Sequence, residues 1–103
     1  MKYYAVVHLK ITDPSWIGGY VEKVTDMVNL SGGRYLARTN EVELIEGHGQ
    51  SPDISIIIEF PSKVAAERFY YSDEYLPFRE QRLKGSHSTL MLIAGKDMTT
   101  LEM

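Results

Sequence analysis

Three segments of the chain carry runs of apolar residues typical of β-strands. They are YYAVVHLKI at residues 3–11, ISIIIEF at residues 54–60 and HSTLMLIAG at residues 87–95. Their β-branched and aromatic side chains pack well on a pleated surface. Side chains alternate between the two faces of a strand, and in all three segments both faces are largely apolar. The pattern therefore predicts strands whose two sides are both covered.

Between these strands the apolar positions recur at helical spacing. Asp13 is a suitable N-cap and Pro14 suits the first helical position, so we expect a helix from there to about Gly32. A second helix begins after an N-cap at Ser62 and carries KVAAERFYYS. A further helical stretch, DEYLPFREQRLKG, ends near Gly85 before the last strand.

Residues 34–46, RYLARTNEVELIE, lie between the first helix and the central strand. Thr39-Asn40 has the residues of a tight turn, so this region is either a β-hairpin or one strand with a bulge. Of the two glycines before it, one suits a left-handed helix C-cap and the other a sharp entry into the hairpin. The segment GHGQSPD, residues 47–53, is predicted to be a loop.

The order of elements is β-α-β-β-α-β, which predicts an α+β, ferredoxin-like fold with a four-stranded antiparallel sheet. We expect one domain over residues 1–95 and a C-terminal tail over residues 96–103. Two helices can cover only one face of such a sheet, and the other face is apolar as well. The simplest cover is a second copy, packed sheet against sheet as a dimeric α/β barrel with the helices outside.

Composition narrows the partners and the location. The net charge is −3 and no run of lysine and arginine occurs, so we do not expect nucleic acid as a partner. No apolar run approaches the roughly 20 residues of a membrane span, and the first residues, MKYYAVVHLKI, lack the apolar core of a signal peptide. We therefore expect a cytoplasmic protein without membrane contact. The absence of cysteine excludes disulfides and thiolate chemistry.

The sequence shows no motif for a cofactor or a metal. The paired glycines lack the spacing of a dinucleotide-binding loop, and no Walker lysine occurs. The three histidines, His8, His48 and His87, fall on different elements without the spacing of zinc ligands. We expect neither a metal site nor a bound cofactor.

Tyrosines and arginines form the most informative set. Tyr75, Arg79 and Arg82 share a helical face, with Tyr70 just upstream and Tyr20 in the middle of the first helix. Guanidinium groups and phenols together suit a planar anion.

The simpler alternative is that Arg79 and Arg82 pair with acids of the same helix on a solvated face, and we favour this for Arg79. Arg34 and Glu46 bracket the predicted hairpin and are expected to be neighbours. They would form either a cross-strand ion pair or one wall of a cleft.

A series of short motifs makes the chain resemble the family catalogued as domain of unknown function 1330. In order these motifs are TDP, GGRYL, VELIEG, IEFPS, AAERFYYSDEY and LIAG, between about Tyr3 and Gly95. Two positions depart from the expected pattern: Phe69 stands where tryptophan is common, and Tyr71-Ser72-Asp73 replaces a more usual Asp-Ser-Pro. The resemblance implies a ferredoxin-like fold of the dimeric α/β-barrel kind and brings no established reaction. Similar barrels include cofactor-free monooxygenases and isomerases, an analogy at the level of the fold.

Our first hypothesis is a homodimer with a pocket between sheet and helices that binds a small anionic or aromatic molecule. The residues expected to line it are Tyr20, Arg34, Tyr70, Tyr75 and Arg82. If the protein is an enzyme, a tyrosine or histidine would move a proton and Arg34 or Arg82 would stabilise an oxyanion, in proton transfer or cofactor-free oxygenation. The alternative is a non-catalytic ligand-binding or stress-response module whose charges serve folding and assembly.

Overall fold

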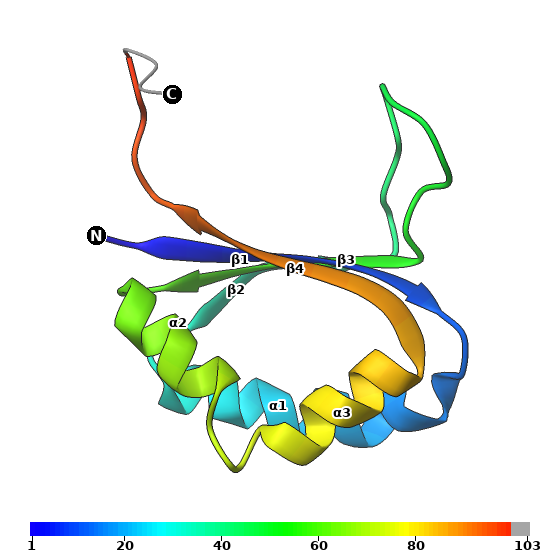
Figure 1. Cartoon of the computed structure of the whole chain (residues 1–103), viewed down its shortest axis with the longest axis horizontal. Helices are drawn as coiled ribbons and strands as arrows, with labels where there is room; N and C mark the ends of the chain where they lie inside the picture. Colours follow the sequence, from blue (N-terminus) through cyan, green and yellow to red (C-terminus); the bar gives the residue numbers. More distant parts are fainter. Residues whose placement is uncertain (100–103) are drawn as a thin grey trace.

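A four-stranded antiparallel sheet forms one layer of the protein and the helices form the other (Figure 1). The computed structural model describes residues 1–99, so the last four residues of the predicted tail lie outside the described part. The sheet has the strand order β2-β3-β1-β4. Its strands are β1 (Tyr3–Ile11), β2 (Arg34–Thr39), β3 (Ile54–Phe60) and β4 (Ser86–Ala94). The helical elements are η1 (Pro14–Trp16), α1 (Ile17–Leu30), α2 (Lys63–Tyr70) and α3 (Leu76–Lys84).

All the helices in the described residues lie on the same face of the sheet, which confirms the predicted ferredoxin-like α+β fold. β1 is central and pairs with both β3 and β4, so that Val7 lies opposite Ile56 on one side and Leu90 on the other. Ala5, Val7 and Leu9 point toward the helices and are almost completely buried. None of the helices in this part of the chain is long and apolar enough to cross a membrane.

The helix ends largely follow the predicted capping residues. The Asp13 carboxylate accepts a hydrogen bond from the Ser15 amide, and Ser62 Oγ accepts one from the Ala65 amide at 3.0 Å. Gly32 follows Ser31, the C-cap of α1, and adopts a φ of 81°, as expected for the left-handed residue that ends a helix. Gly33 is needed for space, since a Cβ atom there would lie 2.7 Å from Val28 Cγ1. These two glycines turn the chain and let β2 approach the helix closely.

Of the two alternatives predicted for residues 34–46, the hairpin is wrong, and the single strand with a bulge holds for residues 34–39. β2 ends at Thr39, carries one bulge beside Tyr35, and pairs only with β3 among the described strands. Residues 40–53, here called the arm, form an irregular loop that stands off the sheet on the side away from the helices (Figure 1). The Thr39 hydroxyl accepts a hydrogen bond from the Glu41 amide, and Ser51 Oγ accepts one from the Leu44 amide. Local side-chain acceptors thus take amides that a hairpin would have paired.

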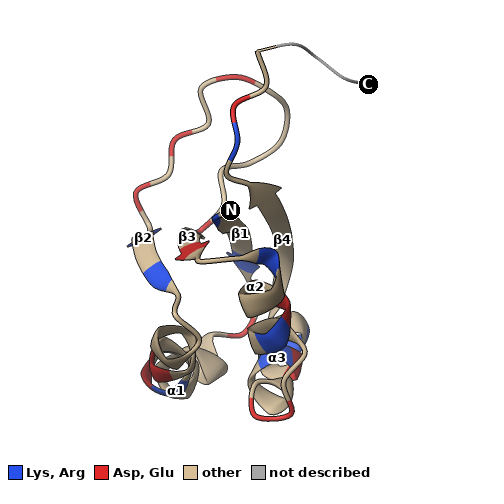
Figure 2. Cartoon of the chain, turned by 90° about the vertical axis from the view of Figure 1, so that its left-hand side faces the viewer, with Lys and Arg blue, Asp and Glu red and all other residues tan. Residues whose placement is uncertain are grey.

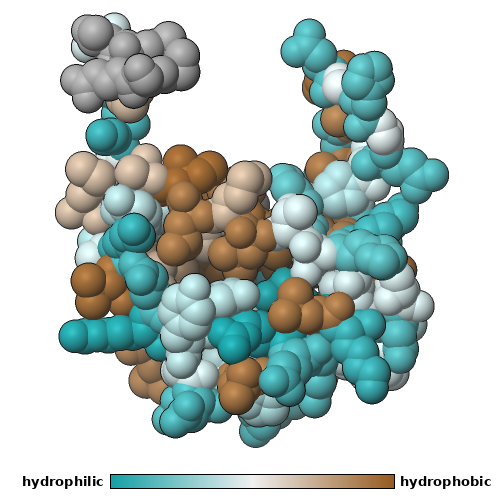
Figure 3. Space-filling view, in the orientation of Figure 1, coloured by the Kyte–Doolittle hydropathy of each residue, from teal (hydrophilic) through white to brown (hydrophobic). Residues whose placement is uncertain are grey.

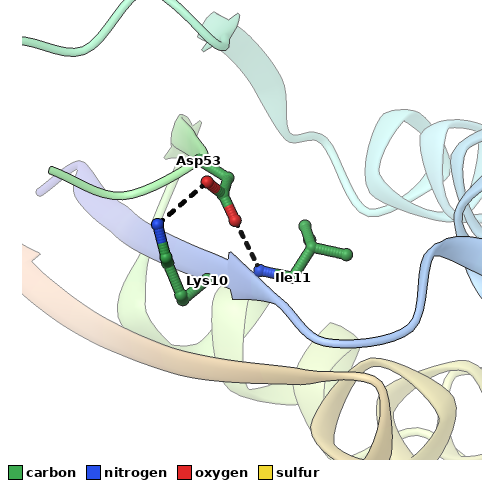
Figure 4. Close-up of polar contacts among 3 residues, drawn as sticks. All are labelled: Lys10, Ile11 and Asp53. Atoms are coloured by element: carbon green, nitrogen blue, oxygen red, sulfur yellow. Dashed lines mark hydrogen bonds and ion pairs between the residues drawn. The ribbon is translucent and has the colours of Figure 1, made fainter. Parts of the chain in front are cut away.

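Asp53 fastens the returning end of the arm to β1 (Figure 4). One carboxylate oxygen accepts a hydrogen bond from the Ile11 amide at 2.8 Å, and the other lies 3.2 Å from Lys10 Nζ. The Asp53 amide donates in turn to the Leu9 carbonyl. The amide of Ile11 and then Lys10 hold the pKa of Asp53 below its ordinary value.

The sheet face opposite the helices carries an exposed apolar patch, flanked by polar positions such as His8, Ser55 and Glu59. Val6 lies across from Ile57 and Met91, and Ile93 continues the same face on β4. Met91 is 53% and Ile93 48% exposed. Hydrophobic atoms gather here at the floor of a notch between the arm and the segment that follows β4 (Figure 3). The arm above it bears acidic positions and no lysine or arginine (Figure 2).

Candidate functional site

A cavity of about 490 Å³ lies between the sheet and the helices. Its walls are mainly apolar side chains of β1, β3 and β4, together with residues of all three α-helices. Small-molecule sites commonly have volumes of about 300 to 1,000 Å³ and few polar groups among apolar walls. The cavity therefore has the size and lining of such a site.

Four of the five predicted site residues line this cavity. Tyr20 comes from α1, Tyr70 from the end of α2, Tyr75 from the turn before α3, and Arg82 from the last turn of α3. They meet because the inner sheet face holds α1 and α3 side by side.

Arg34 does not line the cavity. Its side chain is 70% exposed, and its Nη2 atom lies 3.6 Å from Glu59 on the neighbouring strand. The expected pairing with Glu46 is wrong: Arg34 begins β2, whereas the arm that carries Glu46 leaves from the other end of that strand. Arg34 and Glu59 lie directly opposite each other in the β2–β3 register, so cross-strand geometry selects the partner.

Arg82 is a buried cation with an incomplete set of partners. The residue is 2% exposed. Its Nη1 donates to Ser88 Oγ at 2.7 Å and its Nε to Tyr75 Oη at 3.4 Å, while Nη2 has no hydrogen-bond partner. Within residues 1–99 no acidic side chain forms an ion pair with it. The predicted alternative, a solvated pair with an acid of its own helix, is therefore wrong for Arg82.

Arg79, one turn earlier on α3, differs from Arg82 in its surroundings. It is partly exposed, donates to the Tyr70 carbonyl at 2.8 Å and lies 4.8 Å from the centroid of the Tyr70 ring. It too forms no ion pair with the acids of the described chain, against the favoured expectation. Its contacts fasten α3 to the end of α2 and serve the fold.

Buried Tyr75 and partly buried Tyr20 are strong candidates for hydrogen-bond donors. Tyr20 Oη and Tyr75 Oη are 2.5 Å apart. Burial, and secondly the neighbouring Tyr75, raise the pKa of Tyr20 far above its ordinary value. Burial on its own lowers the pKa of Arg82, but the Tyr75 and Tyr20 oxygens more than offset this and raise it overall. At neutral pH the cavity thus holds a charged guanidinium and a protonated phenol at Tyr20.

Local packing holds Tyr75 in place. The Ser72 hydroxyl donates to the Phe69 carbonyl at 2.8 Å and accepts a hydrogen bond from the Tyr75 amide at 3.2 Å. The Phe69 and Tyr75 rings lie 4.4 Å apart, and Trp16 meets Tyr20 edge-on at 5.1 Å. Both phenols are therefore fixed by aromatic neighbours as well as by each other.

Sequence reasoning missed several polar residues at or beside the cavity. Ser88 receives the hydrogen bond from Arg82. Lys63 and Glu67, 4.0 Å apart on α2, line the cavity, as do Tyr35 and Tyr71. The position of Ser88 could have been recognised from the alternation along β4, since Ser88 lies on the face that presents Leu90 and Leu92 to the cavity. A polar residue on an inward-facing strand position indicates a buried partner.

Comparison with known proteins supports the fold. A family model described as "Domain of unknown function (DUF1330)" matches residues 2–96. No protein with a curated description matches the chain.

Several solved structures are similar to it. The RPA0582 protein of unknown function from Rhodopseudomonas palustris is 14% identical with a TM-score of 0.76, over 94% of this chain and 84% of that one. SnoaB, a cofactor-independent oxygenase from Streptomyces nogalater, is 13% identical with a TM-score of 0.65, over 95% and 96% of the two chains. A dimeric ferredoxin-like protein of unknown function from Jannaschia sp. CCS1 is 9% identical with a TM-score of 0.63, over 91% and 99%. At these identities the likeness concerns the fold alone.

Proposed function

We propose that this chain, which belongs to the DUF1330 family, binds a small anionic or aromatic molecule in the cavity between its sheet and helices. The observation that carries the proposal is Arg82, a buried guanidinium in the cavity wall without an acidic partner. A buried charge without a counter-ion costs several kcal/mol of desolvation. An anion in the cavity would compensate that cost.

The rest of the cavity lining favours an anion with an aromatic or otherwise flat carbon skeleton. Tyr70 and Phe69 add ring surface to the aliphatic wall supplied by the sheet. Flat rings pack well against such surfaces. The positive charge of Arg82 and the apolar walls of the cavity together suit a small organic anion.

We propose in addition that the protein catalyses a reaction of the bound molecule. SnoaB, which shares the fold, is described as a cofactor-independent oxygenase. No histidine lines the cavity within the described chain, so the proton-moving role predicted for a tyrosine or histidine passes to the tyrosines. The raised pKa keeps Tyr20 protonated, so its hydroxyl would donate a hydrogen bond to a developing oxyanion, and Arg82 would stabilise the negative charge. Proton transfer and cofactor-free oxygenation both require such stabilisation.

One observation favours the alternative, a non-catalytic ligand-binding or stress-response module. Glu67 is the single carboxylate in the cavity lining, and it lies 4.0 Å from Lys63 with nearly half of its side chain exposed. Among residues 1–99, the cavity lining beside Arg82 has no carboxylate or histidine that would accept a proton from a substrate. A protein of this design binds an anion without changing it.

A thermal shift screen of small carboxylic acids and neutral aromatic compounds would test binding. We expect acids to raise the melting temperature of the native protein and to lose this effect in Arg82→Met. Arg79→Met, on the same helix but with its side chain outside the cavity, is the matched control and should keep the effect. If no compound raises the melting temperature at high concentration, the proposed function is wrong.

We further propose that the protein is a cytoplasmic homodimer, as expected from the sequence, with the apolar outer sheet face as its interface. Val6, Ile57, Met91 and Ile93 form a continuous apolar surface there, and the arm borders it. Exposed patches of this kind usually mark a contact with another protein. A protein of similar fold is described as dimeric.

Sedimentation at micromolar concentration would test the homodimer. We expect a species of twice the 11.7 kDa chain mass, and dissociation in Met91→Glu. Val64→Glu, which places the same charge at an exposed position of α2, should leave the dimer intact. A native protein that sediments only at 11.7 kDa would contradict the proposal.

A further inference from the structure

Three side chains from separate parts of the chain form a series of polar contacts that ends at the cavity. Arg82 Nε lies 3.4 Å from Tyr75 Oη, and Tyr75 Oη lies 2.5 Å from Tyr20 Oη. Arg82 and Tyr75 are 2% and 1% exposed, whereas Tyr20 is only partly buried. Tyr20 is thus the member of the series that a molecule in the cavity reaches most easily.

The donors and acceptors give this series a direction. A guanidinium nitrogen can only donate, so Tyr75 Oη accepts from Arg82. One proton lies between the two phenol oxygens and belongs to either Tyr75 or Tyr20. If it belonged to Tyr20, the proton of Tyr75 would need another acceptor, and none lies in reach within residues 1–99. A buried donor without a partner is costly, so Tyr75 donates to Tyr20.

With Tyr75 donating, the hydroxyl proton of Tyr20 is left for the contents of the cavity. Hydrogen bonds in series polarise one another, and the cation at the far end makes Tyr20 a stronger donor. The group that the series presents to the cavity is therefore the hydroxyl proton of Tyr20. The charge at its far end is a single positive one, which suits an anion of charge −1.

We propose that the Arg82–Tyr75–Tyr20 series makes the polar end of the cavity specific for the carboxylate of a small aromatic acid, with Tyr20 as the donor to that carboxylate. Tyr75 is a positioning residue, which acts through Tyr20, and Arg82 supplies the positive charge that compensates the carboxylate. The inference rests on the proposed function, because it assumes that the cavity binds a small molecule. The carboxylate accepts a charge-assisted hydrogen bond from Tyr20, whereas the carbonyl of the neutral amide accepts a neutral one, so the amide binds more weakly. Lys63 and Glu67 offset each other in the cavity lining, so a dianion exceeds the single positive charge of Arg82.

Calorimetric titration with 2-naphthoate and 2-naphthamide at pH 7 would test this specificity. A charge-assisted hydrogen bond exceeds a neutral one by about the equivalent of a tenfold affinity ratio, so we expect the native protein to bind naphthoate at least about tenfold more tightly. In Tyr20→Phe the ratio should fall to within about threefold, while naphthamide still binds. Tyr75→Phe should lower the ratio in the same way, because Tyr20 loses the hydroxyl that donates to it. Tyr3→Phe, which removes a phenol outside the cavity, should leave it unchanged.

The possible failures are distinguishable. If the native protein binds neither naphthoate nor naphthamide, the proposed function fails and this inference falls with it. If both probes bind the native protein equally well, the cavity binds small molecules and only the carboxylate specificity is wrong. If naphthoate is preferred and Tyr20→Phe keeps the full ratio, the series is not the source of the preference. A loss of ratio in Arg82→Met that Arg82→Lys partly restores would support the role of the charge.

Discussion

Replacing Arg82 with methionine should make the ligand-free protein more stable. Methionine is close to the aliphatic part of arginine in length and fills irregular apolar space well. The substitution removes a cation that is 2% exposed and has one nitrogen without a hydrogen-bond partner. The perturbation therefore exchanges a partly satisfied buried charge for an apolar side chain of similar reach.

The magnitude follows from the contacts of Arg82. The variant loses a charge-assisted bond to Ser88 at 2.7 Å and a long one to Tyr75 at 3.4 Å, about 1.5 to 3 kcal/mol in total. The substitution leaves no buried polar group without a hydrogen-bond partner, because Tyr75 keeps Tyr20 as a partner and Ser88 is partly exposed to water. Removing the buried cation recovers a desolvation cost of several kcal/mol, because a neutral phenol offers Arg82 a hydrogen bond but no full counter-charge at neutral pH. We expect the free energy of unfolding to rise by about 1 to 3 kcal/mol.

Arg79→Met provides a control of opposite sign. Arg79 is partly exposed, so its charge carries little desolvation cost, and the variant loses the 2.8 Å bond to the Tyr70 carbonyl and the contact with its ring. We expect a loss of about 0.5 to 1.5 kcal/mol. Urea denaturation, extrapolated to water, measures both variants on one scale. If Arg82→Met lowers the free energy of unfolding by 1 kcal/mol or more, Arg82 stabilises the fold and the reasoning about an uncompensated charge is refuted.

Three further predictions concern the fold. Gly85→Ala should lower the free energy of unfolding by about 1 to 3 kcal/mol, because a Cβ atom there would clash with the Trp16 ring. Gly19→Ala has open space around the new Cβ atom and should raise the free energy of unfolding by up to about 1 kcal/mol. Equal effects of the two variants in thermal unfolding would contradict this. Ser62→Ala should cost about 1 kcal/mol of unfolding free energy by removing the N-cap of α2, and Ser62→Asp should restore it. The pKa of Asp53 is lowered in the folded state, so its contribution is complete above the ordinary value of 3.8 and is lost as the pH falls below it. Melting temperatures followed below pH 4 should therefore fall less steeply in Asp53→Asn than in the native protein, and identical slopes would show that Asp53 contributes nothing.

Stability and binding are expected to oppose each other at Arg82. A site that holds a cation away from water in the absence of its ligand is less stable than an apolar one, and proteins commonly accept this at functional positions. A variant that is more stable and no longer binds acids would show this opposition directly.

The sequence predicted those features of the structure that depend on residues close together in the chain. The apolar runs predicted β1, β3 and β4, and Asp13, Ser62 and Gly32 marked helix ends that the structure confirms. Helical spacing and motif order also brought Tyr20, Tyr70, Tyr75 and Arg82 into one predicted site, and the structure places all four around one cavity. Such signals are local because hydrogen bonds of caps and turns, and the period of a helix or strand, involve residues close in sequence.

The tertiary structure decided which residues meet across long stretches of sequence. Arg34 lies beside Glu59 rather than Glu46 because the β2–β3 register places them opposite each other and the arm leaves from the other end of β2. Arg82 is a buried cation beside Ser88 and Tyr75 instead of a solvated one, because α3 packs that side of its last turn against the sheet. The residue types on this helix allow either surface pairing or burial. Only the packing of the helix on the sheet determines which partners, and how much water, each charged group has.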